Sequence, residues 1–545
     1  MPPNTPPWQE RARAKQAQIL ADVPPAFIHT ELTFSETDTQ SMLEVPRTLL
    51  SPLEQEITSL KAEDLVAALV RGQYTAVQVL DAFTHRAAIA HRLLNCCLQF
   101  CYRAARARAE ELDRYLAETG KTVGPLHGLP ILVKDQCRVK GTETTCGFIA
   151  FLGEVDAEDC VLVDLLTKAG ANVFVKTSLS VGCMWGETVN NIIGRTSNPY
   201  NRSFSCGGSS GGEGALLAFR GGPMGVGTDL GGSIRSPSAY QGLWGLRPST
   251  GRFPYHRMRN SCEGQGTIPS VVGPMTHSPA SLELFAKTVV DSQPWLADPK
   301  CLPIPWRDAE AQEIAREGRK LRIGIMHWDK VILPQPPIRQ ALKDARALDL
   351  ALRIFSADAN GDIERTIALS QEPGLEMIGK TNRAPLTILE SWDLAVERTN
   401  FQAAVLQQWA ATASAAGGEG AVMDAYIAPV NPSICPKHGD YSRVRYLAYV
   451  STVNLLDLSA CTVPWTFVDK QRPAHQADDP SGERDAAGNP IPAPTCDLDR
   501  RIRANYDPVV YDGLPVTVQV VARKLEEEKV IAIAKVLERL RGGQG

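Results

Sequence analysis

The chain has 545 residues, with 57 lysines and arginines against 61 aspartates and glutamates, so its formal net charge at pH 7 is −4. This balance and an apolar content of 43% are typical of a soluble globular protein with a sizeable core, and they give no electrostatic reason to expect a nucleic-acid partner. No apolar run is long enough to cross a bilayer, so we expect no membrane span.

The beginning of the chain lacks the apolar segment of a secretory signal, which favours a cytoplasmic location. The chain has thirteen cysteines, an odd number, and no two of them are spaced as C-x-x-C. These spacings fit neither a zinc site nor a disulfide framework. We therefore expect reduced thiols, no metal and no other cofactor.

Residues 1–57 are polar and interrupted by prolines, and we expect them to form an N-terminal arm with a helix over Trp8–Leu20. Residues 58–545 are expected to form a single domain, in which helices and strands alternate. This alternation favours an α/β fold with a mixed central β-sheet covered by helices on both faces. The predicted helices are Val77–Ile89, Ala104–Leu116 and Val161–Lys168, and the predicted strands are Cys97–Tyr102, Ile131–Val133 and Asn172–Lys176.

The composition changes between Ser197 and Pro248, where glycine and small hydroxyl residues dominate. A flexible linker would not contain apolar runs such as ALLAF and YQGLWGL. The dinucleotide fingerprint G-x-G-x-x-G fails at Gly225–Leu230 because its sixth position is leucine, and no nucleoside-triphosphate loop is present. We expect this segment to let backbone N–H groups approach a ligand.

The string GGSSGG contains two overlapping G-x-S-x-G motifs, centred on Ser209 and Ser210, as in the nucleophile elbow of an α/β-hydrolase. An elbow follows an apolar strand, whereas the preceding NPYNRSFSC is polar. The histidines that follow have no evident triad context, so an esterase of this class is a weaker alternative. They are His256, His277, His327, His438 and His475.

Three segments taken together, GPLHGLPILVKDQ, CGGSSGGEGALLA and GVGTDLGGSIRSPSAYQGLWGLRPS, resemble the amidase signature family. Members of this family are serine hydrolases that use two serines and a lysine. Lys134, Ser209 and Ser233 match its three catalytic positions in the expected order. Further segments, including ETVNNIIGRTSNP and YVSTVNLLDLSACTVPWTF, look more narrowly like fungal acetamidase-type members.

The resemblance implies that Ser233 is the nucleophile and that the N–H groups of Leu230, Gly231, Gly232 and Ser233 form an oxyanion hole. It also implies that Ser209, joined to Gly208 by a cis peptide bond, passes protons between Ser233 and Lys134. Lys134 follows the apolar strand ILV, so its stem is expected to be buried, which favours the free amine that a base requires.

Asp229 and Arg235 flank the nucleophile, and we expect them to support the loop as an ion pair. His127 lies in a turn and is expected to be structural, because the relay has no position for it. Three further residues match positions that often line the acyl pocket of the family, although core packing explains them equally well; they are Cys183, Met184 and Trp185.

The chain departs from its acetamidase-like relatives after a predicted strand over Leu321–Met326 and a helix near Pro337–Leu348. We expect about 20 residues of those relatives to have no counterpart near 343–362, before a predicted helix over Ile363–Ser370. A missing strand there would expose a sheet edge and reshape the substrate pocket. The three catalytic motifs are unaffected.

We therefore predict a carbon–nitrogen hydrolase of the amidase signature fold that acts on linear amides, with a homodimer as an open alternative to a monomer. The sequence favours no one acyl group among acetyl, aryl, indolyl and long-chain groups. The alternative from another functional class is a catalytically silent protein of this fold that serves as a binding or assembly subunit. The intact Lys134, Ser209 and Ser233 argue against it.

Overall fold

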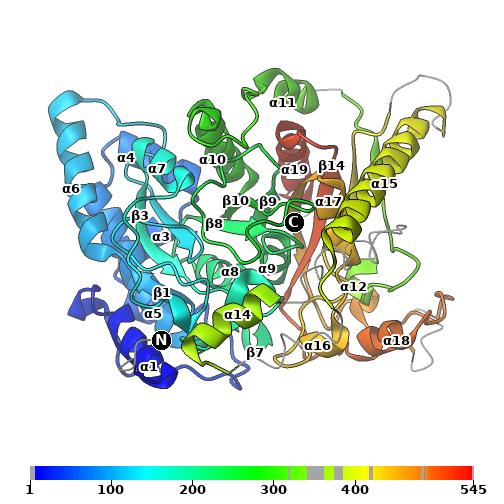
Figure 1. Cartoon of the computed structure of the whole chain (residues 1–545), viewed down its shortest axis with the longest axis horizontal. Coiled ribbons are helices and arrows are strands. Elements are labelled where there is room, and N and C mark those ends of the chain that lie inside the picture. Colours follow the sequence, from blue (N-terminus) through cyan, green and yellow to red (C-terminus); the bar gives the residue numbers. More distant parts are fainter. Residues whose placement is uncertain are drawn as a thin grey trace.

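The computed structural model describes residues 6–316, 319–339, 361–373, 384–415, 422–479, 484–486 and 488–542. A ten-stranded sheet runs through these residues, with helix α6 at one end of the molecule and helix α15 at the other (Figure 1). In spatial order its strands are β1 (Cys97–Phe100), β3 (Asn172–Thr177), β2 (Pro130–Lys134), β8 (Met224–Asp229), β10 (Val271–Thr276), β9 (Trp244–Arg247), β13 (Ser459–Phe467), β14 (Pro515–Ala522), β12 (Ala425–Pro429) and β11 (Ile323–Ile325).

The sheet is mixed, as predicted. Strand β2 is parallel to both of its neighbours, β3 and β8, and β11 is parallel to β12. The other neighbouring strands are antiparallel. Strands β2, β8 and β14 are buried along their whole length, because helices cover the sheet on both sides.

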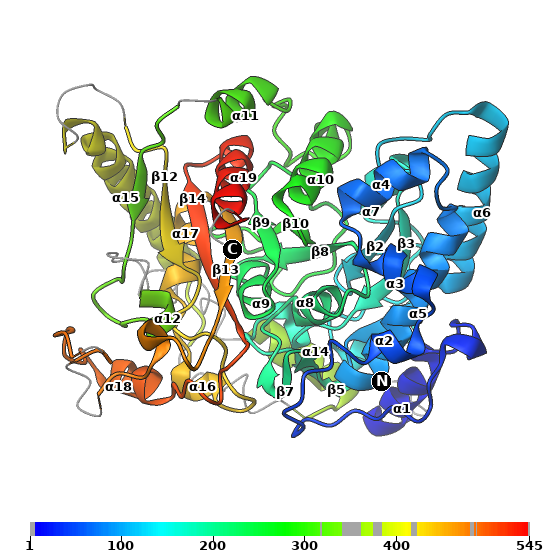
Figure 2. The same ribbon diagram turned by 180° about the vertical axis from the view of Figure 1, so that it is seen from behind.

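Strand β14 shows the two helical layers most clearly. Its Gln519 side chain accepts a hydrogen bond from the guanidinium of Arg235, at the start of α9, whereas its neighbour Val520 lies in the main core with Ile531 of α19. Successive side chains of a strand point to opposite faces, so α9 and α19 lie on opposite faces of the sheet (Figure 2). The prediction of a central sheet covered on both faces is confirmed.

The described α-helices are α1 (Trp8–Ile19), α2 (Pro46–Leu49), α3 (Pro52–Ser59), α4 (Ala62–Val70), α5 (Ala76–Leu94), α6 (Tyr102–Thr119), α7 (Val161–Lys168), α8 (Gly211–Ala218), α9 (Arg235–Tyr240), α10 (Pro279–Asp291), α11 (Asp308–Ala315), α12 (Pro336–Arg339), α14 (Gly361–Ser370), α15 (Ile388–Ala415), α16 (Tyr441–Val444), α17 (Ala448–Leu456), α18 (Asp497–Ala504) and α19 (Glu527–Gly542).

Local sequence signals explain several boundaries. Thr75 and Gln78 form a reciprocal capping box at the start of α5, and Asn95 ends this helix in the left-handed conformation. Strand β1 is shorter than the predicted Cys97–Tyr102, because α6 already begins at Tyr102. The predicted strands at β2 and β3 and the helix at α7 are confirmed within one residue at each end.

The N-terminal residues pack on the first strands of the sheet. Helix α1 is present as predicted, and the Lys15 ammonium donates to the Glu143 carboxylate at 2.6 Å. Ile19 belongs to the same core cluster as Val520. Helix α3 crosses the expected boundary between residues 57 and 58. The division into an arm and a catalytic domain stays a prediction.

The segment of the apparent deletion lies mostly outside the described residues, since 340–360 are not described. Before it, the predicted strand appears as β11, and the predicted helix near Pro337 is seen only as α12, which begins at Pro336. After it, α14 covers the predicted Ile363–Ser370.

All thirteen cysteines lie in the described residues, and none of them forms a disulfide. In the same part of the chain, no helix has the length and apolar character that a bilayer crossing requires. Those residues also contain no group of three or more histidine, cysteine, aspartate or glutamate side chains arranged to bind a metal ion.

Candidate active site

Three chain segments bring the candidate catalytic residues to one edge of the sheet. Lys134 is the last residue of β2, and the parallel neighbour β8 ends at Asp229. Because parallel strands end at the same edge, the turn after β8, which carries Ser233, begins beside Lys134. Ser209 lies in the loop that leads into α8.

The Lys134 side chain is fully buried at the end of β2. Its Nζ lies 2.7 Å from the Ser209 Oγ and 2.7 Å from the Thr228 Oγ1. Among the described residues, no carboxylate lies within ion-pair distance of this amine. The site therefore surrounds Lys134 with hydroxyl groups and supplies no counter-charge for an ammonium ion.

Ser209 is buried, and its peptide bond to Gly208 is cis, which agrees with the expectation from the family resemblance. A Cβ atom at Gly208 would lie 2.5 Å from the Trp185 carbonyl oxygen, so only glycine fits at this position. The Ser210 N–H donates to the Ser233 carbonyl at 3.3 Å. This hydrogen bond joins the Ser209 loop to the Ser233 turn.

A buried ion pair supports the Ser233 turn from behind. Asp229 and Arg235 are both fully buried, and the guanidinium donates two hydrogen bonds to the carboxylate, at 3.0 and 3.1 Å. Asn454 on α17 donates to the same carboxylate at 2.8 Å. Burial by itself would raise the pKa of Asp229, but the Arg235 charge and the hydrogen bonds of Arg235 and Asn454 lower it to about 2. The pair thus stays charged and fixes the turn.

The structure corrects one member of the expected oxyanion hole. The Gly232 N–H donates to the Asp229 carboxylate at 2.8 Å, so this group points into the turn and not toward a ligand. Within the described residues, the N–H groups of Leu230, Gly231 and Ser233 have no acceptor. These three donors are the ones left to stabilise an oxyanion.

A buried carboxyl group that the sequence analysis passed over lies next to this centre. Glu213 on α8 is fully buried and accepts hydrogen bonds from the Thr177 hydroxyl at 2.5 Å and from the Val226 N–H at 2.7 Å. Burial raises its pKa to about 8. A Cβ atom at Gly225 would lie 2.0 Å from this carboxyl group. In the sequence, the one sign of this buried group is that Glu213 stands alone among small and apolar residues.

A small pocket opens at Ser233, with a cavity volume of about 60 Å³. Ser233 is partly exposed there. Leu230 and Gly231 reach it from the same turn. The other residues that line it are Cys183, Met184, Trp185, Gly186, Gly208, Ser236, Tyr441, Arg445 and Leu447.

Part of the pocket wall comes from the chain around α16, which the sequence analysis did not identify. The Tyr441 and Trp185 rings meet edge to face with centroids 5.1 Å apart, and the Arg445 guanidinium lies 5.1 Å from the Trp185 ring centre. A Cβ atom at Gly186 would lie 2.1 Å from the Tyr441 ring. Aromatic rings therefore close the pocket over a glycine.

The other motif candidates do not form a site. His127 is buried, its Nδ1 accepts a hydrogen bond from the Val123 N–H, and burial lowers its pKa. The strand before the GGSSGG motif, β7 (Asn201–Ser205), pairs with β6 (Ser197–Asn198) in a separate ribbon outside the central sheet. The α/β-hydrolase alternative is therefore wrong, because its elbow follows a strand of the central sheet.

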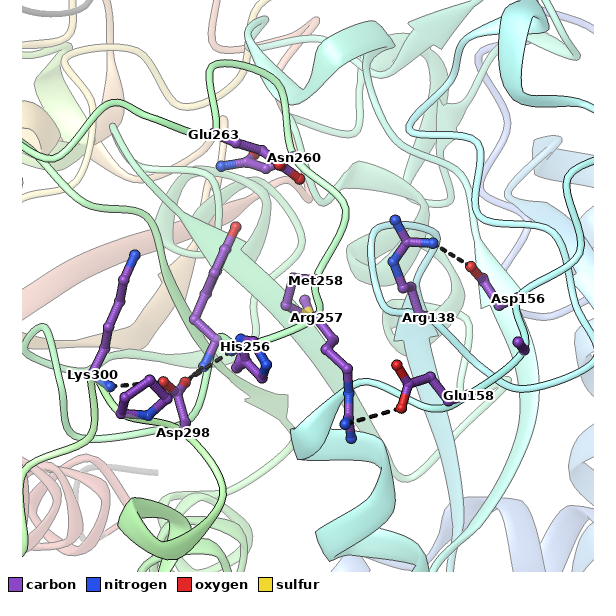
Figure 3. A pocket seen from close by; sticks show the side chains of 13 residues that line it. Arg138, Asp156, Glu158, His256, Arg257, Met258, Asn260, Glu263, Asp298 and Lys300 are labelled. Atoms are coloured by element: carbon purple, nitrogen blue, oxygen red, sulfur yellow. Dashed lines mark hydrogen bonds and ion pairs between the residues drawn. The ribbon is translucent and has the colours of Figure 1, made fainter.

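A larger polar pocket of about 580 Å³ contains none of the three catalytic candidates (Figure 3). In it Arg138 pairs with Asp156 at 2.5 Å and Arg257 pairs with Glu158 at 3.0 Å. Asn260 also lines this pocket. Four of its charged groups are thus paired within the pocket, and the site of the three catalytic candidates lies elsewhere.

Comparison with known proteins agrees with the geometry. The Amidase family model matches residues 78–350 and 377–531, with a break beside the apparent deletion. The acetamidase of Emericella nidulans is 42% identical over 562 aligned residues, which cover 98% of each chain. The acetamidase of Aspergillus oryzae is 41% identical, over 98% of this chain and 99% of its own.

A solved structure of fatty acid amide hydrolase matches 98% of this chain and 95% of its own chain, with a TM-score of 0.86 and 28% identity. The family assignment made from the sequence motifs is confirmed by these relatives and by the fold. The chain belongs to the amidase signature family of amide hydrolases, among members similar to the fungal acetamidases, and is an amidase.

Proposed function

We propose that this amidase is a serine hydrolase that cleaves the carbon–nitrogen bond of small linear amides through an acyl-enzyme on Ser233. The observation that carries the proposal is the buried contact of 2.7 Å between the Lys134 amine and the Ser209 hydroxyl, beside a turn that carries a partly exposed serine and three free N–H donors. This arrangement supplies a base, a proton carrier, a nucleophile and an anion site.

In the first half of the reaction, the Ser233 Oγ attacks the amide carbonyl carbon. The Ser233 proton passes to Ser209, and the Ser209 proton passes to the free amine of Lys134. The carbonyl oxygen becomes an oxyanion, and the N–H groups of Leu230, Gly231 and Ser233 donate to it. Because these donors are fixed by the turn, they need no rearrangement when the charge develops.

The tetrahedral intermediate then collapses. The proton on Lys134 returns through Ser209 to the leaving nitrogen, the carbon–nitrogen bond breaks, and ammonia or an amine departs. Water takes the place of the leaving group and gives up its proton along the same route. Hydrolysis of the acyl-enzyme releases a carboxylate and restores the Ser233 hydroxyl.

The pocket supports a short acyl group. Its volume of about 60 Å³ leaves space for only a few non-hydrogen atoms, and Trp185 and Tyr441 close it. The most similar relatives reported above are named acetamidases. We therefore propose short-chain aliphatic amides as the substrate class.

A silent binding or assembly subunit is the weaker alternative. Such a protein would have no need to keep a fully buried lysine among hydroxyl groups, since a buried amine without a counter-charge is unfavourable for stability. The cytoplasmic location and the homodimer stay predictions.

The proposal is tested by measuring kcat/KM for a graded series of linear amides, from acetamide to hexanamide, in the parent enzyme and in Ser233→Ala. We expect turnover of the shortest members, falling as the acyl chain lengthens, and no turnover in a Ser233→Ala protein that melts at the same temperature. An active Ser233→Ala variant would refute the assigned nucleophile.

A further inference from the structure

The second hydroxyl group at the Lys134 amine belongs to Thr228, on β8, and a third polar residue lies behind it. Lys134 donates to the Thr228 Oγ1 at 2.7 Å, and the Thr228 hydroxyl donates to the Gln136 Oε1 at 2.8 Å. Gln136 is fully buried two residues beyond Lys134. The three side chains form one continuous line of hydrogen bonds.

The orientation of the Gln136 amide is fixed at its other end. Its Nε2 donates to the Tyr255 Oη at 2.8 Å and to the Asn260 Oδ1 at 2.9 Å. The Tyr255 hydroxyl gives its own hydrogen to the Ser270 Oγ at 3.0 Å, so its oxygen is free to accept. Both N–H bonds of the amide are used, which leaves its oxygen toward Thr228.

The fixed amide decides the direction of the next hydrogen bond. A threonine hydroxyl has one hydrogen, and here that hydrogen is directed at the Gln136 oxygen. Thr228 can then meet Lys134 only as an acceptor. A free amine has two N–H bonds and one lone pair, so with one N–H of Lys134 directed at Thr228 the lone pair can accept from the Ser209 hydroxyl, 2.7 Å away.

The opposite direction would block the relay. If Thr228 donated its hydrogen to the Lys134 lone pair, the amine could not accept a proton from Ser209 until the hydroxyl had turned. A freely rotating threonine would spend part of its time in that state. The amide of Gln136 removes this state, because it holds the hydrogen of Thr228.

We propose that Gln136 and Thr228 are positioning residues that direct the lone pair of Lys134 at Ser209 and so set the direction of proton transfer. The proposal rests on the Ser233–Ser209–Lys134 relay of the proposed function and adds two residues to it. Neither residue gains or loses a proton in the cycle. When Lys134 takes up the Ser209 proton, its N–H bond to Thr228 is kept, and the same proton later returns through Ser209.

A double-mutant cycle tests the proposal. Gln136→Met keeps the length of the side chain and frees the Thr228 hydroxyl, and Thr228→Val removes that hydroxyl. We expect each to lower kcat about tenfold while KM changes less than twofold, because only the proton transfer is affected. The double variant should be no slower than Thr228→Val, since Gln136 acts only through Thr228.

Thr228→Ser is the matched control, because it keeps the hydroxyl and loses a methyl group; its kcat should be within about threefold of the parent value. Melting temperatures show whether each variant folds. If Gln136→Met or Thr228→Val fails to fold, Tyr255→Phe replaces it, since this change removes one acceptor of the Gln136 amide. We expect it to lower kcat about threefold at constant KM.

Two results would overturn the proposal: additive losses in the double variant, or an unchanged kcat in Gln136→Met or, where that variant does not fold, in Tyr255→Phe. Ser233→Ala is measured beside them to separate the two hypotheses. Activity in Ser233→Ala would refute the proposed function itself. An inactive Ser233→Ala together with full activity in the Gln136 and Thr228 variants would refute only the positioning roles.

Discussion

The catalytic edge of the sheet and the wall of the pocket meet at Ser233, and different contacts stabilise them. At the edge, Lys134, Asp229 and Arg235 are fully buried and linked by short hydrogen bonds. In the wall, the Trp185 and Tyr441 rings meet edge to face, and Arg445 is exposed. We therefore expect the chemistry to depend on the geometry of the edge, whereas changes in the wall should alter the substrate preference.

The largest effect should come from the base at the catalytic edge. Lys134→Arg should lower kcat by about 10³-fold, because a guanidinium keeps its proton at any usable pH and cannot accept one from Ser209. Steady-state kinetics measure this effect. Lys168→Arg is the control, since Lys168 lies on the surface of α7 in a pair with Asp164, and its kcat should not change. Substantial activity in Lys134→Arg would contradict the relay.

The Asp229–Arg235 ion pair behind the turn should contribute more to the free energy of unfolding than an exposed ion pair near the pocket wall. Asp229→Asn leaves the Arg235 charge buried without a counter-charge and should lower the free energy of unfolding by about 3 to 5 kcal/mol. Asp440→Asn breaks the exposed pair with Arg443 near the pocket wall and should change it by less than about 1 kcal/mol. Urea unfolding measures the free energy of unfolding of both variants. Equal losses in Asp229→Asn and Asp440→Asn would contradict the difference between the buried catalytic edge and the exposed pocket wall.

The pocket wall should control the length of the acyl group. Tyr441→Ala opens the space beside Gly186 and should raise the ratio of kcat/KM for hexanamide to that for acetamide by about tenfold or more. Tyr441→Phe keeps the ring and should leave the ratio unchanged. Initial-rate measurements with hexanamide and acetamide give this ratio for each variant. An unchanged ratio in Tyr441→Ala would place the acyl group elsewhere.

A further prediction concerns the dependence of stability on pH. Because burial raises the folded-state pKa of Glu213 to about 8 from an ordinary 4.5, the folded state retains a proton that the unfolded state loses between these values. Stability should therefore fall as pH rises through this window, by up to about 1.4 kcal/mol per pH unit from this group.

Glu213→Gln matches the uncharged acid and should remove this contribution. The variant should gain stability relative to the parent as pH rises from 5 to 8, which urea unfolding at several pH values can measure. A difference between the two proteins that stays constant with pH would show that Glu213 is already ionised in the folded enzyme.

The sequence predicted the catalytic edge better than the pocket wall, and the physical reasons differ. Ser209 and Ser233 lie in a glycine-rich segment whose close backbone contacts, as at Gly208, exclude other residue types, and Lys134 ends the apolar strand β2. Tyr441 and Arg445 reach the pocket from a short helix more than 200 residues farther along the chain, and no local pattern marks their role. The bond from Gly232 to Asp229 depends on the shape of the turn, which motifs do not specify.

Similar reasons apply to the fold. Short apolar runs predicted β2, β3 and α7, which are mostly buried, regular elements. The predicted end of β1 lay two residues too far along the chain, because α6 begins directly beyond Cys101. The order of strands in the sheet depends on contacts between distant segments and could not be predicted from periodicity.

Mass spectrometry after reaction with a fluorophosphonate shows whether Ser233 is the residue that carries the acyl group. We expect one adduct per chain, located on the peptide that contains Ser233, formed at the rate at which activity is lost. We also expect acetamide to slow the labelling and Ser233→Ala to remain unlabelled. An adduct on Ser209 or Ser210, or full labelling of Ser233→Ala, would show that Ser233 is not the nucleophile.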